Sequence, residues 1–411
     1  MSRPFLLRTA LGLLLAGGAS AQVQSTQPTS DSLTAERVVA LARAHAPRVR
    51  IATSAVREAR GRLSGARSPG RENPTIQGVA STDERFERRT QWELNVPIGI
   101  GFGFAGRVGV ARAEYEREKH SLADARRGAV GAALAAYYRV QHASLRVELA
   151  RERLEVAVDL RKTALDRHRA GQVPRLEVLL TETEEVRAES ELLAEEELLA
   201  RERIPLAAAL GEPSGERLLL AGDLAEWSFI QRTLAGSAPA RRADVLAAEQ
   251  EVQAANAART LARGDFLPAL AFRLDYGHEN GEPLVQPGLA VTLPIFQYGQ
   301  ESRALARARG ERARAELERT QNAAVSEEQG LSRAFELAGR AVDGLVERAL
   351  PRVAEAEGMV RESYRAGKLD LPALLVVRRD LLDTRREYLD RLLDAALTGI
   401  DLAVARGHFQ Y

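Results

Sequence analysis

The chain has 411 residues and no cysteine, and its 58 Lys and Arg against 57 Asp and Glu give a formal net charge of +1. This balance excludes a strongly basic nucleic-acid-binding protein and an acidic tail protein. The lack of cysteine excludes a disulfide framework, a thiolate metal site and a cysteine nucleophile. With 45% hydrophobic, 28% charged and 5% aromatic residues, the composition is typical of long helices and coiled coils.

The N-terminus has the features of an export signal. Arg3 and Arg8 come before the apolar stretch 11–16, and the small residues Ala19 and Ala21 follow it. We expect cleavage after Ala21, so that residues 1–21 form a signal peptide. The apolar stretch is too short to span a bilayer, which takes about 20 apolar residues. The sequence therefore predicts an exported protein.

An internal duplication organises the mature chain. The sequence His-Arg-Ala-Gly at 168–171 recurs as Tyr-Arg-Ala-Gly at 364–367, an offset of 196 residues that continues without a gap for about 40 residues. We divide the mature chain into two structural repeats, residues 22–222 and 223–411.

Two heptad columns obey the same offset. The first column runs from Val178 to Leu206 and matches Leu374 to Leu402. The neighbouring column starts at Leu179 and matches the column that starts at Leu375. The agreement of both columns argues against a chance match of the two halves.

Each repeat is predicted to contain a helix, two short strands, a very long helix, a glycine turn and a return helix. The first helices are expected at residues 37–67 and 242–263, with Thr34 placed to cap the earlier one. The long helices are expected at residues 106–168 and 300–364, about 95 Å each at 1.5 Å per residue.

Glycine and proline occur at the helix turns, where helices are expected to end and begin. Gly171 and Gly367 end the long helices, and Pro174 and Pro372 stand just inside the return helices, which are about 55 Å long. Antiparallel helices of this length do not suit a compact globular domain. They require a bundle or a tube.

Alternating apolar and polar residues predict strands of about 9–11 residues, the length of a tilted membrane strand. The strands are expected at residues 90–98, 268–276 and 288–295, with a weaker candidate at 75–81. The polar segments 82–89 and 277–286 are expected to be extracellular loops.

One face of these strands is expected to contact lipid: Trp92, Leu94, Leu270, Phe272 and Leu274. Trp92 would lie in an interfacial aromatic belt or pack between protomers, and Arg273 would face the lumen. A soluble hairpin with one buried face shows the same alternation, but the helices leave no partner layer for two hairpins. Four strands cannot close a barrel, and open strand edges are costly in lipid. The chain is therefore expected to oligomerise.

Short motifs recur in the same order in both repeats. They are Asn73-Pro74 and Leu267-Pro268 before the strand pairs, Val96-Pro97-Ile98 and Leu293-Pro294-Ile295 after them, and the Arg-Ala-Gly turns before Glu177-Val178-Leu179 and Leu374-Leu375. With this duplicated order, the chain resembles the TolC-like outer-membrane efflux protein family over essentially the whole mature sequence.

The resemblance implies a mainly α-helical protein with a transmembrane β-barrel part. Three copies would form a twelve-stranded barrel in the outer membrane lipid, with four strands from each chain, continued by a long α-helical tunnel across the periplasm. The homotrimer would be the passive exit duct for a periplasmic adaptor protein and an inner-membrane efflux pump. The modest length and Asn73-Pro74 fit the cation-efflux branch of the family, but the sequence does not name the cargo.

Members of this family commonly close the periplasmic end of the tunnel with acidic side chains near the helix turns. Ala373 and Val376 occupy positions where aspartate is frequent in such members. We expect Glu177, with Arg175 and Arg169, to form a substitute gate. Solvated charges at a helix end are the alternative for each of them.

Both turns are expected at the periplasmic end, where they would meet the adaptor. The contact candidates at the turns are Arg169, Gly171, Val173, Arg365, Gly367 and Leu369, with Val173 and Leu369 expected to be exposed.

No constellation predicts catalysis, a cofactor or a metal. Residues 101–106 match G-x-G-x-x-G, but the helix that follows is about 60 residues long and does not belong to a βαβ unit. These glycines are expected instead to let the barrel wall bend into the tunnel. The six histidines lack metal-ligand spacing, and no serine stands in a G-x-S-x-G elbow.

Two alternatives remain open at this point. A periplasmic adaptor also carries a helical hairpin, but only one, inside a lipoyl-like β domain. A soluble coiled-coil scaffold would differ from the duct in needing no detergent for its solubility.

Overall fold

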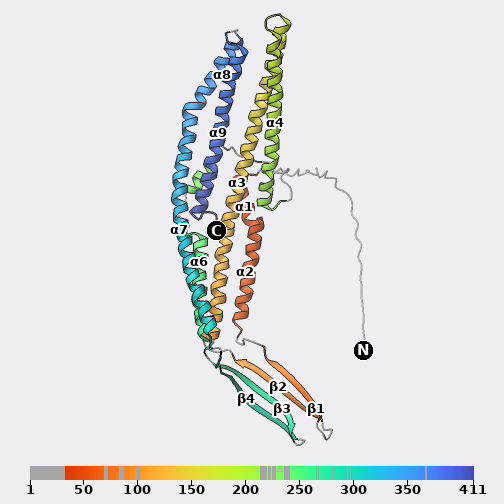
Figure 1. Ribbon diagram of the computed structural model, residues 1–411, viewed down its shortest axis with the longest axis vertical. Coiled ribbons are helices and arrows are strands. Elements are labelled where there is room, and N and C mark those ends of the chain that lie inside the picture. The colour runs from red at the N-terminus through yellow and green to blue at the C-terminus, as the bar shows by residue number, and fades with distance from the viewer. Residues whose placement is uncertain are drawn as a thin grey trace, which may run out of the picture.

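The computed structural model describes residues 33–68, 73–82, 88–98, 102–212, 220, 224, 228–235, 241–264, 266, 268–279, 282–293, 295–296, 298–365 and 368–411. The expected signal peptide, Gly101 and Gly367 lie outside these residues. The described part is elongated: long helices run side by side, and a four-stranded sheet extends from one end of them (Figure 1).

The helices are α1 (Ala35–His45), α2 (Pro47–Ala66), α3 (Phe102–Arg169), α4 (Arg175–Leu210), α5 (Ser228–Ala235), α6 (Ala243–Gly264), α7 (Gln300–Gly344), α8 (Leu350–Arg365) and α9 (Leu371–Ala405). A π-helical turn, Leu345–Ala349, joins α7 to α8. The strands are β1 (Thr75–Thr82), β2 (Arg88–Ile98), β3 (Ala269–Glu279) and β4 (Glu282–Thr292). The helix α5 had no counterpart in the sequence prediction.

The predicted helix at residues 37–67 is two helices. Pro47 starts α2, where its missing N–H costs nothing, and it disfavours the helical region for the residue before it. Ala46 accordingly has φ −53° and ψ 133°. Thr34 caps α1 as predicted, because its hydroxyl accepts a hydrogen bond from the amide of Arg37 at 3.3 Å.

The long helices follow the prediction in extent but not in detail. The first, α3, spans 68 residues and begins at Phe102 rather than Gly106, and the second is interrupted by the π-helical turn. Pro174 is the N-cap of α4 rather than a residue inside it, whereas Pro372 does lie in the first turn of α9. None of the helices in the described part combines the length and hydrophobicity needed to cross a bilayer.

The sheet is antiparallel, in the order β1-β2-β3-β4, so that β2 and β3 join the two repeats. The pairing of β3 with β4 continues to Glu279 and Glu282, which corrects the prediction of a loop over 277–286. The polar residues of this segment suggested that loop. Its Pro283 is accommodated because β4 is an edge strand of the single chain, and edge strands tolerate proline. The other predicted loop is also shorter, because β2 begins at Arg88.

The strand register separates an apolar face from a polar face. The apolar cross-strand pairs of β2 and β3 are Trp92–Tyr276, Leu94–Leu274, Val96–Phe272 and Ile98–Leu270. The five residues predicted to contact lipid therefore share one face. On the other face, Arg273 donates to Glu93 and to Asp275, at 3.0 Å each. Contact with lipid remains a prediction.

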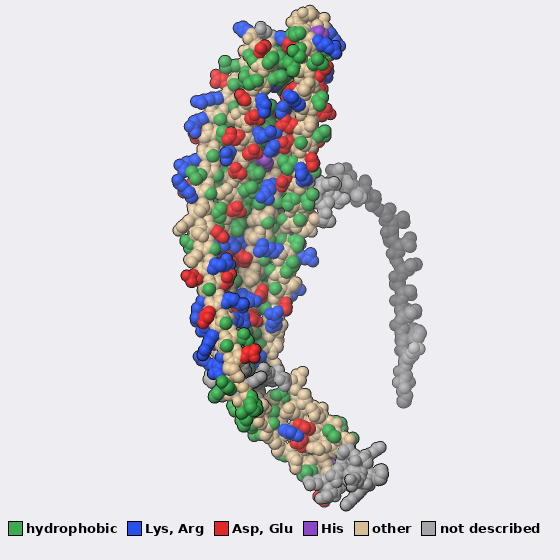
Figure 2. All heavy atoms as spheres, in the orientation of Figure 1, with side chains coloured by type: hydrophobic (Ala, Val, Ile, Leu, Met, Phe, Trp, Pro, Cys, Tyr) green, Lys and Arg blue, Asp and Glu red, His purple; other side chains and the backbone are tan. Residues whose placement is uncertain are grey.

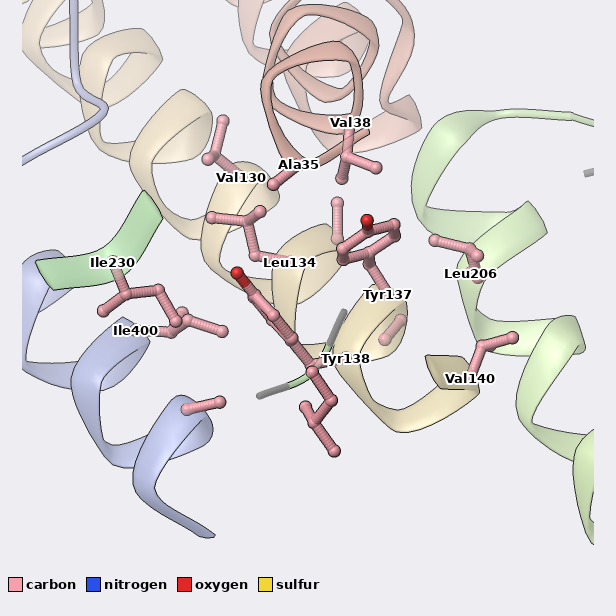
Figure 3. Close-up of a cluster of buried hydrophobic side chains, with 14 of the residues drawn as sticks. Ala35, Val38, Val130, Leu134, Tyr137, Tyr138, Val140, Leu206, Ile230 and Ile400 are labelled. Atoms are coloured by element: carbon pink, nitrogen blue, oxygen red, sulfur yellow. The ribbon is translucent and has the colours of Figure 1, made fainter. Parts of the chain in front are cut away.

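The main core lies midway along the helices. Tyr137 and Leu134 of α3 pack there against Val38 of α1, Leu206 of α4 and Ile400 of α9 (Figure 3). The two repeats thus pack against each other at this level of the molecule. Above and below this level the helices expose mixed positive and negative side chains (Figure 2).

Candidate functional site: the hairpin tips

The helices form two long hairpins whose turns lie at the end of the molecule far from the sheet (Figure 1). One hairpin is α3 with α4, and the other is α7 and α8 with α9. The duplication implied that equivalent turns would share one end, and they do. We name the region around these turns, residues 160–180 and 356–376, the hairpin tips.

The first turn is closed by backbone hydrogen bonds and a left-handed glycine. Gly171 has φ +72°, a conformation that strains residues with a side chain. The amide of Gln172 donates to the carbonyl of Arg167 at 2.9 Å, as in a Schellman motif. Nδ1 of His168 donates to the carbonyl of Val173, also at 2.9 Å. Val173, expected to be exposed, is half-buried.

The second turn is described on both sides of Gly367. The amide of Lys368 donates to the carbonyl of Ser363 at 2.9 Å, and Asp370 caps α9 by accepting from the amide of Ala373 at 3.1 Å. Leu369 packs partly buried against a small apolar cluster, so the expectation that it is exposed was wrong. The Arg365 side chain lies outside the described part.

A contact that the sequence did not predict links the two tips. The hydroxyl of Tyr364 donates to Oε1 of Glu177 at 3.1 Å, and the Arg167 guanidinium lies 5.0 Å from the centre of the Tyr364 ring. Burial, and after it the hydrogen bond to Glu177, raises the pKa of Tyr364. The sequence did contain a signal for this contact. The position of the second repeat that corresponds to His168 holds an aromatic residue, Tyr364.

The predicted gate residues are not brought together. Glu177 is held by Tyr364 rather than by an arginine, and Arg169 lies 3.6 Å from Asp166 of its own helix. Arg175 is exposed, and in the described part of the chain it forms no ion pair with Glu177. The tip is therefore ordered by a tyrosine–carboxylate contact between hairpins.

Replacing Tyr364 by phenylalanine should loosen the contact between the tips. The ring and its arginine neighbour stay, while Glu177 loses a hydrogen bond of about 0.5–1.5 kcal/mol. Hydrogen exchange should quicken in residues 175–180. Tyr115→Phe is the control, because no hydrogen bond of the Tyr115 hydroxyl occurs within the described residues. Unchanged exchange in Tyr364→Phe would show that the bond does not order the tip.

Comparison with known proteins identifies the family. The family described as outer membrane efflux protein matches residues 38–212 and 234–408. The chain belongs to this family. The second matched segment begins 196 residues after the first, which is the offset found in the sequence.

One curated relative and two solved structures illustrate the likeness. The chain is 24% identical over 350 residues to the cobalt-zinc-cadmium resistance protein CzcC of Cupriavidus metallidurans, covering 81% of each protein. A membrane protein of Pseudomonas aeruginosa has a TM-score of 0.75 at 20% identity, covering 90% of this chain and 92% of that one. The open outer-membrane channel MtrE of Neisseria gonorrhoeae has a TM-score of 0.74 at 18% identity, covering 91% and 88%.

This efflux protein is an outer-membrane channel of a tripartite efflux system, and it is not an enzyme. The channel is trimeric, and its helices extend into the periplasm. The fold expected from the sequence, mainly helical with four strands per chain, is confirmed. The adaptor and scaffold alternatives are excluded. Among the described residues, no group of three or more His, Asp or Glu side chains could hold a metal ion.

Proposed function

We propose that the hairpin tips dock a periplasmic adaptor, which joins the channel to an inner-membrane pump. The observation that carries this proposal is the position of both tips at the end opposite the sheet (Figure 1). A helix of 68 residues places them about 100 Å from the sheet. A partner anchored at the inner membrane would reach this end first.

The exposed apolar residues at the tips supply a contact surface for such an adaptor. Leu176 and Val376 are 63% and 62% exposed, in the first turn of α4 and the second turn of α9. They replace Val173 and Leu369 as the apolar contact candidates. Arg169 is also exposed at the first tip and stays a candidate, together with Gly171.

Replacing Gly171 by valine should abolish adaptor binding and efflux while the barrel still inserts. A β-branched residue at φ +72° costs at least about 1–2 kcal/mol and should distort the turn. The measurements are membrane fractionation, cross-linking to the adaptor and an efflux assay. The equivalent change at Gly367 is expected to act in the same way.

Gly330→Val provides the matched control outside the hairpin tips. Gly330 lies inside α7, and an added Cβ meets no atom within 4 Å. This variant should bind the adaptor and export normally. Normal cross-linking and efflux in Gly171→Val would instead leave the turn as a structural cap.

Divalent metal cations are the cargo that we propose for this channel. The support is the similarity to CzcC, a cobalt-zinc-cadmium resistance protein, over 81% of both chains. A strain without this channel should become sensitive to Co²⁺, Zn²⁺ and Cd²⁺, and a plasmid copy should restore growth. Sensitivity to dyes and detergents with unchanged metal tolerance would identify an organic cargo instead.

A further inference from the structure

The helix ends next to the sheet carry an excess of positive charge. The eight residues nearest the sheet in each of α2, α3, α6 and α7 include seven arginines and a single acidic residue, Glu301. The whole chain is nearly balanced, with 58 basic and 57 acidic residues, so this positive region is a local feature. We name these four helix ends, residues 59–66, 102–109, 257–264 and 300–307, the junction.

One arginine of the junction is repeated by the duplication. Arg107 of α3 and Arg303 of α7 are separated by the offset of 196 residues. The Arg107 guanidinium lies 5.6 Å from the centre of the Phe104 ring. The Arg303 guanidinium lies at the same distance, 5.6 Å, from the centre of the Tyr298 ring. Both repeats thus place an arginine over an aromatic ring next to the sheet.

Neither arginine has a carboxylate partner within the described residues. Arg107 donates through Nε to the carbonyl of Ala66 at 3.3 Å, and through Nη2 to the carbonyl of Ser68 at 3.1 Å. Arg303 donates in the same way, at 3.1 and 3.3 Å, to the carbonyls of Gly299 and of the residue before it. These carbonyls fix the two guanidiniums but do not neutralise them. In the described part of the chain, Nη1 of both arginines has no hydrogen-bond acceptor.

Two arginines further from the sheet are neutralised within the chain. Arg309 of α7 lies 3.0 Å from Glu251 of α6, and Arg117 of α3 lies 2.7 Å from the same carboxylate. Arg309 also lies 3.3 Å from Glu114. The described structure therefore pairs arginine with glutamate along the helices and leaves the positive charge of Arg107 and Arg303 uncompensated at the junction.

The apolar face of the sheet continues up to the junction. Val291 lies opposite Leu270 in the register of β3 and β4, and its side chain is exposed. Leu293 and Ile295 continue the alternation beyond the end of β4 and are also exposed, and Phe296 is 89% exposed. In Figure 2, hydrophobic side chains gather where the helices meet the sheet, beside Lys and Arg side chains of the helix ends.

The lengths of the strands place the junction at the surface of the membrane. The strands β2, β3 and β4 have 11 residues each, and a tilted strand needs about 9–11 residues to cross the hydrocarbon core. The helices extend into the periplasm, so the junction is at the periplasmic side. Side chains at this level meet lipid headgroups, where tyrosine is enriched and arginine reaches out to the polar surface.

We propose that Arg107 and Arg303 each bind the phosphate of an anionic phospholipid in the periplasmic leaflet of the outer membrane. Nη1 of each fixed guanidinium donates to a phosphate oxygen, and the rings of Phe104 and Tyr298 lie at the boundary of the acyl chains. Such a charge-assisted hydrogen bond is stronger than one between neutral groups. The excess of arginine favours a lipid of net negative charge over a zwitterionic lipid. The site is distinct from the hairpin tips.

Native mass spectrometry of the trimer measures the bound lipid directly. The trimer is purified in mild detergent and mixed with equal amounts of phosphatidylglycerol and phosphatidylcholine that have the same acyl chains. We expect the trimer to retain phosphatidylglycerol preferentially, up to six molecules, because each of the three chains has two sites. Equal retention of the two lipids would overturn the proposal without any variant.

Charge-removing variants assign the two sites. Arg107→Gln and Arg303→Gln should each weaken one site about fivefold and lower the number of tightly held lipids to three. The double glutamine variant should lose the preference for phosphatidylglycerol. The double variant Arg107→Lys/Arg303→Lys keeps the charge and should keep the preference, which a role limited to the bonds with backbone carbonyls does not predict.

Arg187→Gln is the matched control for these variants. Arg187 is exposed on α4, far from the sheet, and it forms no ion pair within the described residues. This variant should retain the same lipids as the unchanged trimer. An equal loss in Arg187→Gln would show that the preference follows the total charge of the protein and not the junction.

Three further results would contradict the proposal. An unchanged preference in the double glutamine variant would show that another group binds the lipid. Displacement of phosphatidylglycerol by inorganic phosphate at the same concentration would indicate a site for free anions. A changed ion selectivity of single-channel currents in the double glutamine variant, with unchanged lipid binding, would place the arginines in the lumen. None of these readouts needs the adaptor, so they succeed or fail apart from the docking function.

Discussion

Replacing Phe272 by arginine is expected to prevent stable assembly of the channel in the outer membrane. Phe272 lies two residues from the midpoint of β3, on the apolar face, opposite Val96 and Leu289. An arginine on the lipid face costs about 2–4 kcal/mol at the bilayer midplane and less toward the interfaces. The measurements are the yield of folded trimer in outer membranes and its resistance to urea.

Two changes on the polar face of the same sheet serve as controls. Gln286→Arg places the same new charge opposite Asp275, and we expect it to be tolerated. Arg273→Ala removes exposed ion pairs, each of which contributes about 0–1 kcal/mol. If Phe272→Arg and Gln286→Arg were tolerated equally well, the assignment of the lipid face would be wrong.

Replacing Gly106 by alanine should destabilise the junction between the helices and the sheet. A Cβ at Gly106 would lie 2.4 Å from the backbone nitrogen and Cα of Leu261. Backbone atoms cannot turn aside as a side chain can, so α3 and α6 must separate. Overpacking of this kind costs about 1–3 kcal/mol, and the midpoint of thermal unfolding in detergent should fall.

Gly103→Ala is the matched control, three residues earlier in the same glycine motif. An added Cβ there meets no atom within 4 Å, and alanine favours a helix over glycine by about 0.5–1 kcal/mol. The variant should be neutral or slightly more stable. If both variants behaved alike, the close approach of α3 and α6 would not be the reason for Gly106. The glycines were expected to let the barrel wall bend into the tunnel. Gly103 and Gly106 instead lie inside α3, and the close approach of α3 and α6 explains Gly106.

The first of the two duplicated heptad columns predicted the fold because it marks a buried face of the helices. Val178, Leu206, Leu374 and Leu402 of the first column are all buried in the structure. The strand faces followed from alternation for the same reason, since a one-residue shift in register moves every side chain to the other face. The first residues of β4 were missed because the polar segment 277–286 was expected to be a loop.

The contacts between helices could not be predicted from the sequence alone. Arg153, for example, reaches Glu184 of α4 at 2.7 Å. Which arginine meets which glutamate depends on the rotation and stagger of two helices, and these are set by packing. Tyr364 was missed at the tip because its partner, Glu177, is 187 residues away in the chain.

The π-helical turn makes the two hairpins of one chain different from each other. A tube built from six identical hairpins could present six equal contacts at its end. Here one kind of hairpin carries the π-helical turn Leu345–Ala349 and the other does not, so the rim of a trimer alternates between two kinds of tip. A partner that reads this rim must recognise a three-fold pattern, with two unlike footprints in each third of the circle.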